Sequence, residues 1–308
     1  MITILMTTLN GEKYIAEQIE SLLNQTETRW KLVIQDDCSN DKTAEIIQDY
    51  VRRYSSKIIF VERESPSGSA KNNFSSMLKF AKTDYMMTCD QDDVWLPQKI
   101  EVTLQKILEL EETFSKKIPL LVHTDLKVVD SNLKIVAESM FKRQNLNYCR
   151  DGLNNLLVQN IVTGCTLMVN ATLLNRIQEI PQESIMHDWW FALIAATFGH
   201  IGFVNQSTIL YRQHSKNEVG SKNARSLLYN IKRMINTQQS KSVLKDTYKQ
   251  AKSFSEIYKS QFITPLLHIV YIYSCIPQCK KIKRLVTIYK YNFWKTGFFR
   301  RCGQILFM

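Results

Sequence analysis

Three carboxylates stand within four residues at Asp90, Asp92 and Asp93, directly after the apolar run Tyr85–Cys89. Like charges this close raise one another's pKa, so the cluster is costly unless a cation relieves the repulsion. Mg²⁺ and Mn²⁺ prefer carboxylate oxygens and often keep part of their coordination shell for substrate phosphates. Asp90 and Asp92 are two residues apart, so both can face one ion in a turn that leaves a strand. This stretch alone fits a solvated acidic turn equally well.

Alternating strands and helices are expected to position these carboxylates. Short apolar runs predict strands at residues 1–6, 30–34, 58–61 and 85–89, and amphipathic spacing predicts helices at 14–23, 44–54 and 70–80. This alternation indicates right-handed βαβ units and a parallel sheet, in which ligands bind at the carboxyl ends of the strands. Polar residues follow three of the runs, at 7–10, 36–37 and 90–93, so we expect them to converge on one edge of the sheet.

The rest of the chain continues as a mixture of helices and strands. We expect a long helix at 97–114, strands at 120–125, 127–130, 164–169, 201–204 and 208–213, and a helix over about 153–159. A short helix is expected after Asn170, and an apolar helix opens at His187-Asp188-Trp189-Trp190 and runs to about 198. The fold class is α/β.

The charge of the chain is unevenly distributed. The formal net charge is +11, but residues 222–308 hold 17 Lys/Arg against two acidic residues, whereas residues 1–221 have a net charge of −4. We therefore expect a body over 1–220 and a basic helical region over 221–308. Such a region suits an anionic partner, either a membrane or a nucleic acid.

The cysteine pattern and the hydropathy of the sequence indicate the cellular compartment of the protein. The seven cysteines are scattered without a zinc-binding spacing, which favours reduced thiols. The N-terminus has no basic segment before its short apolar run, so we expect no signal peptide. A spanning helix needs about twenty apolar residues, and the nearest candidate, 262–276, contains Pro265 and His268. We expect a cytoplasmic protein at the inner face of the membrane.

Over roughly residues 1–220 the chain resembles the family 2 glycosyltransferases, which have the GT-A fold and use nucleotide sugars. The resemblance rests on six motifs in order along the chain: Thr7-Thr8-Leu9-Asn10-Gly11-Glu12, Leu23-Asn24-Gln25-Thr26, Ile34-Gln35-Asp36-Asp37-Cys38-Ser39, Gly68-Ser69-Ala70-Lys71-Asn72-Asn73, Asp90-Gln91-Asp92-Asp93-Val94-Trp95-Leu96-Pro97 and His187-Asp188-Trp189. The form of the fifth motif, with Tyr211-Arg212-Gln213-His214, looks most like bacterial rhamnosyltransferase-type members.

This resemblance implies a nucleotide-binding site. Asp36 and Asp37 would accept hydrogen bonds from the nucleobase, and a carboxylate suits the imide N–H that uracil and thymine share. The other implied donor-binding residues are Thr7, Asn10, Glu12, Lys71, Asp90 and Gln91.

It also implies a metal site and a catalytic base. Asp92, Asp90 and His214 would hold Mn²⁺ or Mg²⁺ against the diphosphate, which stabilises the leaving group. Asp188 matches the base that takes the proton of the acceptor hydroxyl during inverting transfer. His187 stands where the family usually has Glu, so its role is open. The acceptor and sugar side would be formed by Asp93, Gly164, Cys165, Trp189 and Arg212.

The basic region has the pattern of interfacial helices. An apolar stripe at 227–235, a mixed stretch at 282–290 and the aromatic residues at 293–299 alternate with Lys and Arg. Such helices lie in the interface of an anionic bilayer. The alternative is a helical cap on the body whose basic face is merely solvated.

The leading hypothesis is therefore an inverting, metal-dependent glycosyltransferase. It would move rhamnose or another hexose from a dTDP- or UDP-sugar to a growing cell-surface polysaccharide carried on a lipid. A nucleic-acid-binding protein is the first alternative, disfavoured because the chain has no recognised nucleic-acid module. An enzyme that joins a sugar phosphate to a nucleotide is the second, disfavoured because Thr7–Gly11 lacks the basic loop that such enzymes carry.

Overall fold

The computed structural model describes residues 1–214, 237–261 and 264–308, so the stripe expected at 227–235 lies outside the described residues. The chain divides into two compact units. The first comprises Met1–Met140, Val162–Ile177 and His200–Gly220, and the second comprises Phe141–Ile161, Gln178–Gly199 and Ser221–Met308. One boundary lies at residue 220, but the second unit also includes two segments of the body, one of which carries Asp188.

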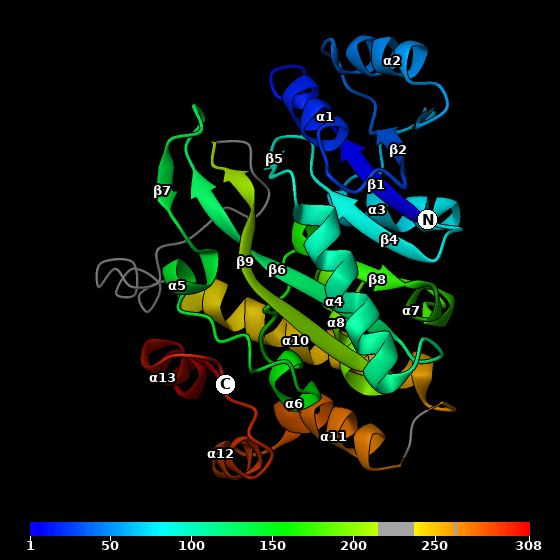
Figure 1. Cartoon of the computed structure of the whole chain (residues 1–308). Helices are drawn as coiled ribbons and strands as arrows, with labels where there is room; N and C mark the ends of the chain where they lie inside the picture. The colour runs from blue at the N-terminus through cyan, green and yellow to red at the C-terminus, as the bar shows by residue number, and fades with distance from the viewer. Residues whose placement is uncertain (215–236, 262–263) are drawn as a thin grey trace. The chain divides into compact units, whose positions relative to one another are not determined.

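Four parallel strands and their connecting helices open the first unit. The strands are β1 (Ile2–Thr8), β2 (Trp30–Asp36), β3 (Ile58–Val61) and β4 (Tyr85–Cys89), arranged in the order β3-β2-β1-β4. They are joined by α1 (Ile15–Leu23), α2 (Thr43–Arg53) and α3 (Ala70–Met77), which continues into the 3-10 turn η1 (Leu78–Phe80). All seven residues of β1 are buried, as expected for a central parallel strand covered on both faces. The expected βαβ frame is confirmed (Figure 1).

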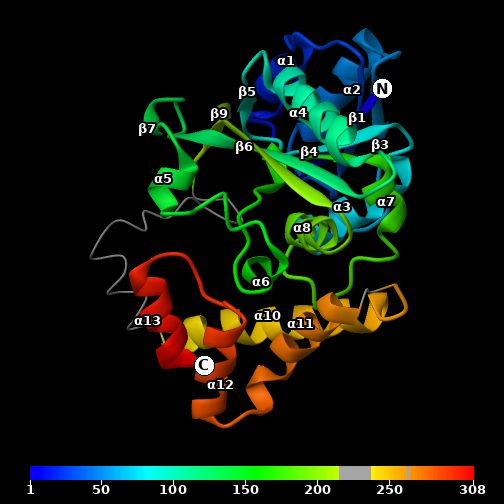
Figure 2. The same ribbon diagram turned by 60° about the horizontal axis from the view of Figure 1, so that its bottom comes forward.

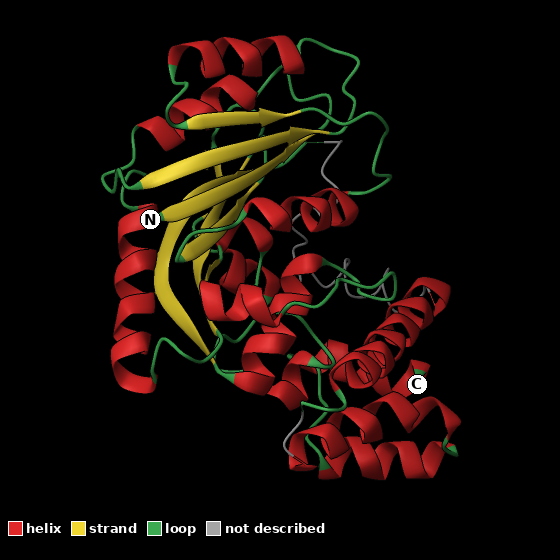
Figure 3. Cartoon of the chain, turned by 90° about the vertical axis from the view of Figure 1, so that its right-hand side faces the viewer, coloured by secondary structure: helices red, strands yellow, loops and turns green. Residues whose placement is uncertain are grey.

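The sheet continues beyond β4 with mixed pairing. The short strand β8 (Met168–Asn170) pairs antiparallel with β4 and with β6 (Leu120–Val129), and β9 (His200–Arg212) runs parallel to β6. The edge strands β5 (Val94–Trp95) and β7 (Ile135–Ala137) pair antiparallel with β9 and β6. Helix α4 (Lys99–Phe114) packs along β6 and β9, and α7 (Ala171–Arg176) follows β8. Figure 3 shows the twisted sheet with helices against it.

Three expectations for the strands were wrong. The expected pairs at 120–125 with 127–130, and at 201–204 with 208–213, are single strands, β6 and β9, whose register shifts between Thr124 and Lys127. Such irregularities break the alternation of buried and exposed residues without ending a strand. The strand expected at 164–169 begins as a 3-10 turn, η2 (Gly164–Thr166), because the Leu167 amide donates to the carbonyl of Gly164 instead of to a neighbouring strand.

The second unit is helical. Its elements are α5 (Met140–Gln144), which starts at the last residue of the preceding first-unit segment, α6 (Leu153–Leu156), α8 (His187–Phe198), α10 (Thr237–Tyr258), α11 (Thr264–Cys275), the 3-10 turn η3 (Ile276–Gln278), α12 (Lys281–Lys290) and α13 (Phe298–Phe307). Helices α10 and α11 lie side by side (Figures 1 and 2). None of the helices in the described ranges is both long and apolar enough to cross a bilayer.

Aromatic contacts join the basic region to α8 within this unit. The ring centroids of Trp190 and Phe254 are 5.0 Å apart, and those of Tyr273 and Phe293 are 4.9 Å apart. Helix α8 is buried almost all round, which is typical of a helix inside a core. Helix α10 therefore packs against the helix that carries Asp188.

Candidate active site

The ends of β1, β2 and β4 meet at one edge of the sheet. Thr8 at the end of β1 lies beside Asp36 at the end of β2, and Met6 lies beside Cys89 at the end of β4. The polar segments that follow these strands are therefore neighbours, as expected from the topology. All three belong to the first unit.

Gln91 joins the segment after β4 to the segment after β1. Its side-chain Oε1 accepts from the Leu9 amide and its Nε2 donates to the Leu9 carbonyl, each at 2.9 Å. This close approach needs a glycine at position 11, because a Cβ there would stand 2.2 Å from Oε1 of Gln91. The structure thus gives Gln91, expected at the donor site, a role in fastening two loops.

Asp36 holds the turn after β2. Its Oδ1 accepts from the Thr8 hydroxyl at 2.7 Å and from the Ser39 hydroxyl at 2.6 Å, and its Oδ2 accepts from the Ser39 amide at 2.7 Å. The carboxylate is buried, and its hydrogen bonds tie the ends of β1 and β2 together. Between Asp36 and Ser39, Cys38 adopts a positive φ of 63°, which turns the chain sharply.

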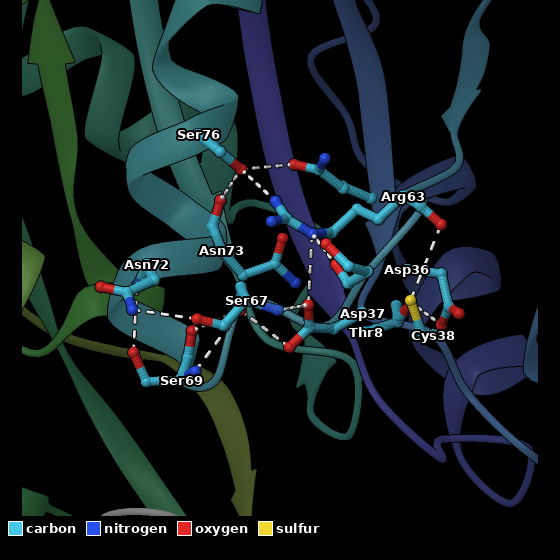
Figure 4. A network of polar contacts seen from close by, with 12 residues as sticks. Thr8, Asp36, Asp37, Cys38, Arg63, Ser67, Ser69, Asn72, Asn73 and Ser76 are labelled. Carbon is cyan, nitrogen blue, oxygen red and sulfur yellow. Dashed lines mark hydrogen bonds and ion pairs between the residues drawn. The ribbon is translucent and has the colours of Figure 1, made fainter.

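Asp37 lies in a polar network that Figure 4 shows together with Thr8 and Asp36. Its Oδ1 accepts from the Ser67 amide at 2.6 Å and its Oδ2 from the Ser67 hydroxyl at 2.8 Å, while Nε of Arg63 lies 3.4 Å from Oδ1. The network continues from Arg63 through Ser76 to Gln35 on β2. Asp37 is therefore fixed between the end of β2 and the loop that leads into α3.

The remaining donor residues expected from the sequence surround these carboxylates. Asn10 and Glu12 bind the loop before α2, since their side chains accept from the amides of Asn40 and Lys42 at 2.9 and 3.0 Å. Thr7 is buried near the end of β1, and Lys71 is half-buried in the first turn of α3. The structure thus places Thr7, Asn10, Glu12 and Lys71 around the same edge of the sheet.

His214 reaches the Asp-x-Asp segment although it is 122 residues away in sequence. Its Nε2 lies 2.6 Å from Oδ2 of Asp92, and its ring stacks on Tyr14 with a centroid distance of 5.2 Å. Imidazole and carboxylate that meet in this way are suitable neighbouring ligands for a divalent ion. Tyr14, which supports the histidine, carries no sequence signal apart from its place before α1.

Arg212 fastens the same segment from the end of β9. Its backbone amide donates to Oδ1 of Asp93 at 3.0 Å, and its Nε donates to the Asp92 carbonyl at 2.8 Å. Two further nitrogens donate to the Ser131 carbonyl and to the Glu17 carboxylate, and the guanidinium lies 4.5 Å from the centre of the Tyr14 ring. Arg212 is 2% exposed, so the guanidinium itself is shielded from water, whereas the side chain of Glu17 is 49% exposed.

A second cluster lies on the buried side of the acidic segment. Ligand atoms of Asp90, Asp93 and Cys165 lie within 4.8 Å of one another. Burial, followed by the charges of Asp92 and Asp90, raises the pKa of Asp93 well above its usual range. Burial and the nearby carboxylates also raise the pKa of the Cys165 thiol, which makes it a poor ligand for a hard cation.

The residues present fit a divalent cation. Mutual repulsion among the three carboxylates contributes to the raised pKa of Asp93, and a bound cation would favour the charged forms. Asp90, Asp92 and His214 offer hard oxygen and nitrogen ligands, and His214 contacts Asp92, but among the described residues the ligand atoms that lie within 4.8 Å of one another are those of Asp90, Asp93 and Cys165. Beneath them burial lowers the pKa of Lys99 to about 8, and its Nζ lies 4.3 Å from the centre of the Trp95 ring.

The expected catalytic base lies in the second unit, at the start of α8. Asp188 is 8% exposed, and its Oδ1 accepts from the Trp189 amide at 2.6 Å. The Trp189 indole donates to the Leu156 carbonyl at 2.6 Å, which fixes this helix end to α6. His187 is buried, and burial lowers its pKa to about 3, so its imidazole is neutral at physiological pH. Gly164 belongs to the first unit, where its carbonyl accepts from the Thr88 hydroxyl at 2.6 Å.

Comparisons with known proteins show which family and which proteins the chain is similar to. Residues 3–116 match the family described as "Glycosyl transferase family 2". The chain is 27% identical over 229 residues to the dTDP-rhamnosyl transferase RfbG of Shigella flexneri, covering 70% of this chain and 74% of that protein. It is 26% identical over 216 residues to the putative teichuronic acid biosynthesis glycosyltransferase TuaG of Bacillus subtilis, covering 69% of this chain and 79% of that protein.

Solved structures share the fold. The UDP complex of S. aureus TarS aligns with a TM-score of 0.54 at 18% identity, covering 95% of this chain and 92% of that chain. The complex of the mannosyltransferase PcManGT of Pyrobaculum calidifontis with GDP-Man and Mn²⁺ aligns with a TM-score of 0.56 at 15% identity, covering 94% and 73%. The chain therefore shares the GT-A fold of these structures, with its mostly parallel sheet. The chain is a glycosyltransferase that resembles family 2 and, within it, rhamnosyltransferase-like members.

Proposed function

We propose that this chain is an inverting, metal-dependent hexosyltransferase that uses a dTDP- or UDP-sugar, with rhamnose as the first donor to test. The acceptor is a growing cell-surface polysaccharide carried on a lipid. The observation that carries the proposal is the contact of His214 with Asp92 at the edge where β1, β2 and β4 end. The names of RfbG and of a glucosyltransferase for a diphosphoundecaprenol-linked acceptor support the donor and the acceptor.

The nucleotide is proposed to bind beside Asp37. Two carboxylate oxygens offer about four acceptor positions, and Ser67 and Arg63 take three of them. The imide N–H of uracil or thymine is a donor that suits the remaining position. Because Ser67 and Arg63 fix the carboxylate before the ligand arrives, little ordering cost is left for binding.

Asp90, Asp92 and His214 are proposed to hold Mn²⁺ or Mg²⁺ at the diphosphate. When bound, the ion supplies Lewis-acid stabilisation of the leaving nucleoside diphosphate. Arg212 and Tyr14 keep Asp92 and His214 in position. Asp188 takes the proton of the acceptor hydroxyl as that oxygen attacks the anomeric carbon from the face opposite the leaving group. The neutral imidazole of His187 adds no charge beside this carboxylate.

Donor binding and product release test the proposal. The unfolding temperature is measured with UDP, dTDP and their sugars, with and without Mn²⁺, because a ligand well above its Kd stabilises the native state by a few kcal/mol. We expect a shift that requires the metal and is lost in Asp92→Asn. The surface variant Asp49→Asn is the matched control.

Asp188→Asn then separates binding from catalysis. It should keep the metal-dependent thermal shift and lose transfer, since the amide cannot accept the proton. Release of a nucleoside diphosphate indicates transfer, whereas pyrophosphate release from a nucleoside triphosphate would identify a nucleotidyltransferase instead. Normal transfer by Asp188→Asn would refute the assignment of the base.

A further inference from the structure

Helix α13 turns its polar side toward the second unit and its apolar side toward solvent. Gln304 is 2% exposed, donates to the Phe293 carbonyl at 2.6 Å and accepts from the Lys295 amide at 3.0 Å. Arg300, on the same side, donates to the carbonyls of Gln144 and Asn145 at 2.6 and 3.0 Å. By contrast Phe298 and Leu306 are 75% and 55% exposed. This is the reverse of the usual orientation of an amphipathic helix on a core.

Helix α12 also presents apolar side chains outward. Ile282, Val286 and Tyr289 are 79%, 59% and 80% exposed, and their spacing of four and three residues places them on one face. Ile288, on another face of the helix, is fully buried and anchors α12 in the second unit. Figure 2 shows α12 and α13 as the last two helices of the chain.

Exposed lysines stand beside this stripe. Lys281, Lys283 and Lys290 lie at about 100° or less to either side of it on the helix and are exposed. Across residues 280–308 the sequence has eight Lys/Arg and no Asp or Glu. The outward faces of α12 and α13 thus combine apolar side chains with positively charged ones.

We propose that these faces dock on an anionic phospholipid bilayer. The interfacial face consists of Ile282, Val286, Tyr289, Phe298 and Leu306, with Lys281, Lys283 and Lys290 at its margin. Apolar side chains enter the boundary between headgroups and acyl chains, and lysines at the margin bind lipid phosphates. The inference deepens the proposed function, on which it rests for its biological reason, because a lipid-borne acceptor is available only at the membrane.

The positive charge and the exposed apolar side chains of α12 and α13 disfavour other binding partners at these faces. A second copy of the chain would bring two regions of like charge together, which opposes association. A nucleic acid would pair with the lysines but would leave the aliphatic side chains of Ile282, Val286 and Leu306 without an apolar environment. A bilayer interface accommodates both kinds of side chain.

The structure also corrects which residues take part. From the sequence, Ile288 and Phe293 belong to the stretches expected at the membrane, but both are fully buried in the second unit. Phe293 packs against Tyr273 and Tyr291 at centroid distances of 4.9 and 5.7 Å. Ile288 and Phe293 therefore belong to the core of the second unit. The inner side of α12 packs as a helical cap, which was the alternative considered from the sequence. The membrane proposal concerns only the outer side of α12.

Co-sedimentation of the full chain with vesicles tests the inference. Vesicles of phosphatidylcholine with phosphatidylglycerol are compared with phosphatidylcholine alone, at low and high salt. The apolar variant carries Ile282→Gln, Val286→Gln and Tyr289→Gln, and a second carries Phe298→Gln and Leu306→Gln. The matched control replaces two exposed apolar residues of the first unit, Ile59→Gln and Leu108→Gln.

We expect wild type and control to bind the anionic vesicles, and each apolar variant to bind about tenfold or more weakly. Replacing Lys281, Lys283 and Lys290 with Gln should weaken binding most at low salt, where screening is least. Binding of the apolar variants at the wild-type level would overturn the inference. So would equal binding of wild type to neutral vesicles, or an absence of binding to either kind.

Two further measurements separate this inference from the proposed function. The metal-dependent thermal shift with nucleoside diphosphates should be unchanged in the apolar variants, because their substitutions lie outside the donor site. If wild type showed no metal-dependent thermal shift, the proposed function would be refuted. The vesicle experiment would still test membrane binding independently. Wild-type self-association in sedimentation velocity that the apolar variants abolish would identify a second copy as the occupant and overturn the membrane proposal.

Discussion

Replacing Arg212 with lysine should loosen the metal-binding segment while keeping the positive charge. The guanidinium donates at the same time to the Asp92 carbonyl, the Ser131 carbonyl and the Glu17 carboxylate. A lysine ammonium is a point donor on a flexible stem and does not reproduce this fork. We therefore expect Arg212→Lys to keep one of these contacts and to lose two.

The expected loss of stability follows from these contacts. Hydrogen bonds that involve a charged group contribute roughly 1.5–3 kcal/mol each, so the loss of two costs about 3–6 kcal/mol. That is a large share of the roughly 5–15 kcal/mol that separates most native proteins from the unfolded state. For a chain of this size the unfolding temperature should fall by roughly 10 °C.

Thermal unfolding of Arg212→Lys, with and without Mn²⁺ and nucleoside diphosphate, is the assay. We expect a lower midpoint and a smaller metal-dependent shift, because Arg212 holds Asp92 and supports Tyr14 beneath His214. The control is Arg29→Lys, whose exposed side chain pairs with Glu27 two residues away and should unfold close to wild type. If Arg212→Lys retained both the wild-type midpoint and the full metal effect, Arg212 would not position this segment.

Three further results are expected. Gly11→Ala should displace the Gln91 amide, since the new Cβ would stand 2.2 Å from its Oε1, and should weaken donor-dependent thermal stabilisation, whereas Gly152→Ala, with its nearest contact at 3.7 Å, should not. His214→Ala should raise the Mn²⁺ concentration needed for the thermal shift, measured by titration, and an unchanged titration would remove His214 from the metal site. Burial lowers the pKa of His123 from 6.5 to about 3. The unfolded state therefore binds the proton at a higher pH than the native state does. The free energy of unfolding should fall by about 1.4 kcal/mol per pH unit as the pH drops from about 6.5 toward 3. In urea unfolding at pH 7.5 and 5.5, His123→Asn should show a smaller pH dependence than wild type; an equal dependence would count against this reasoning.

The first half of the fold was predictable because its signals are local. Strands β1 to β4 are short apolar runs, of which β1 is buried on both faces, and the helices between them have regular amphipathic spacing. Parallel topology then brings the ends of β1, β2 and β4 to one edge. The neighbourhood of Asp36, Asp90 and Asp92 follows from these rules alone.

Long-range contacts at that edge needed the tertiary structure. The pairing of β5 with β9 carries Arg212 and His214 to the segment after β4, 119 to 122 residues earlier in sequence. No periodicity in the chain encodes which polar side chain meets which carboxylate. Tyr14 and Glu17 have their roles only because α1 lies beside β5.

In the basic region, the sequence determined some features and the tertiary structure determined others. Its charge and its mixture of apolar and basic residues are properties of the sequence, and they sufficed to predict helices with an anionic partner. Which apolar residues form the core and which face outward depends on how each helix is rotated as it packs. On helix α12, Ile288 is buried and Ile282 is exposed, although the two side chains are identical. The difference arises because burial depends on the surface that each side chain contacts in the folded chain.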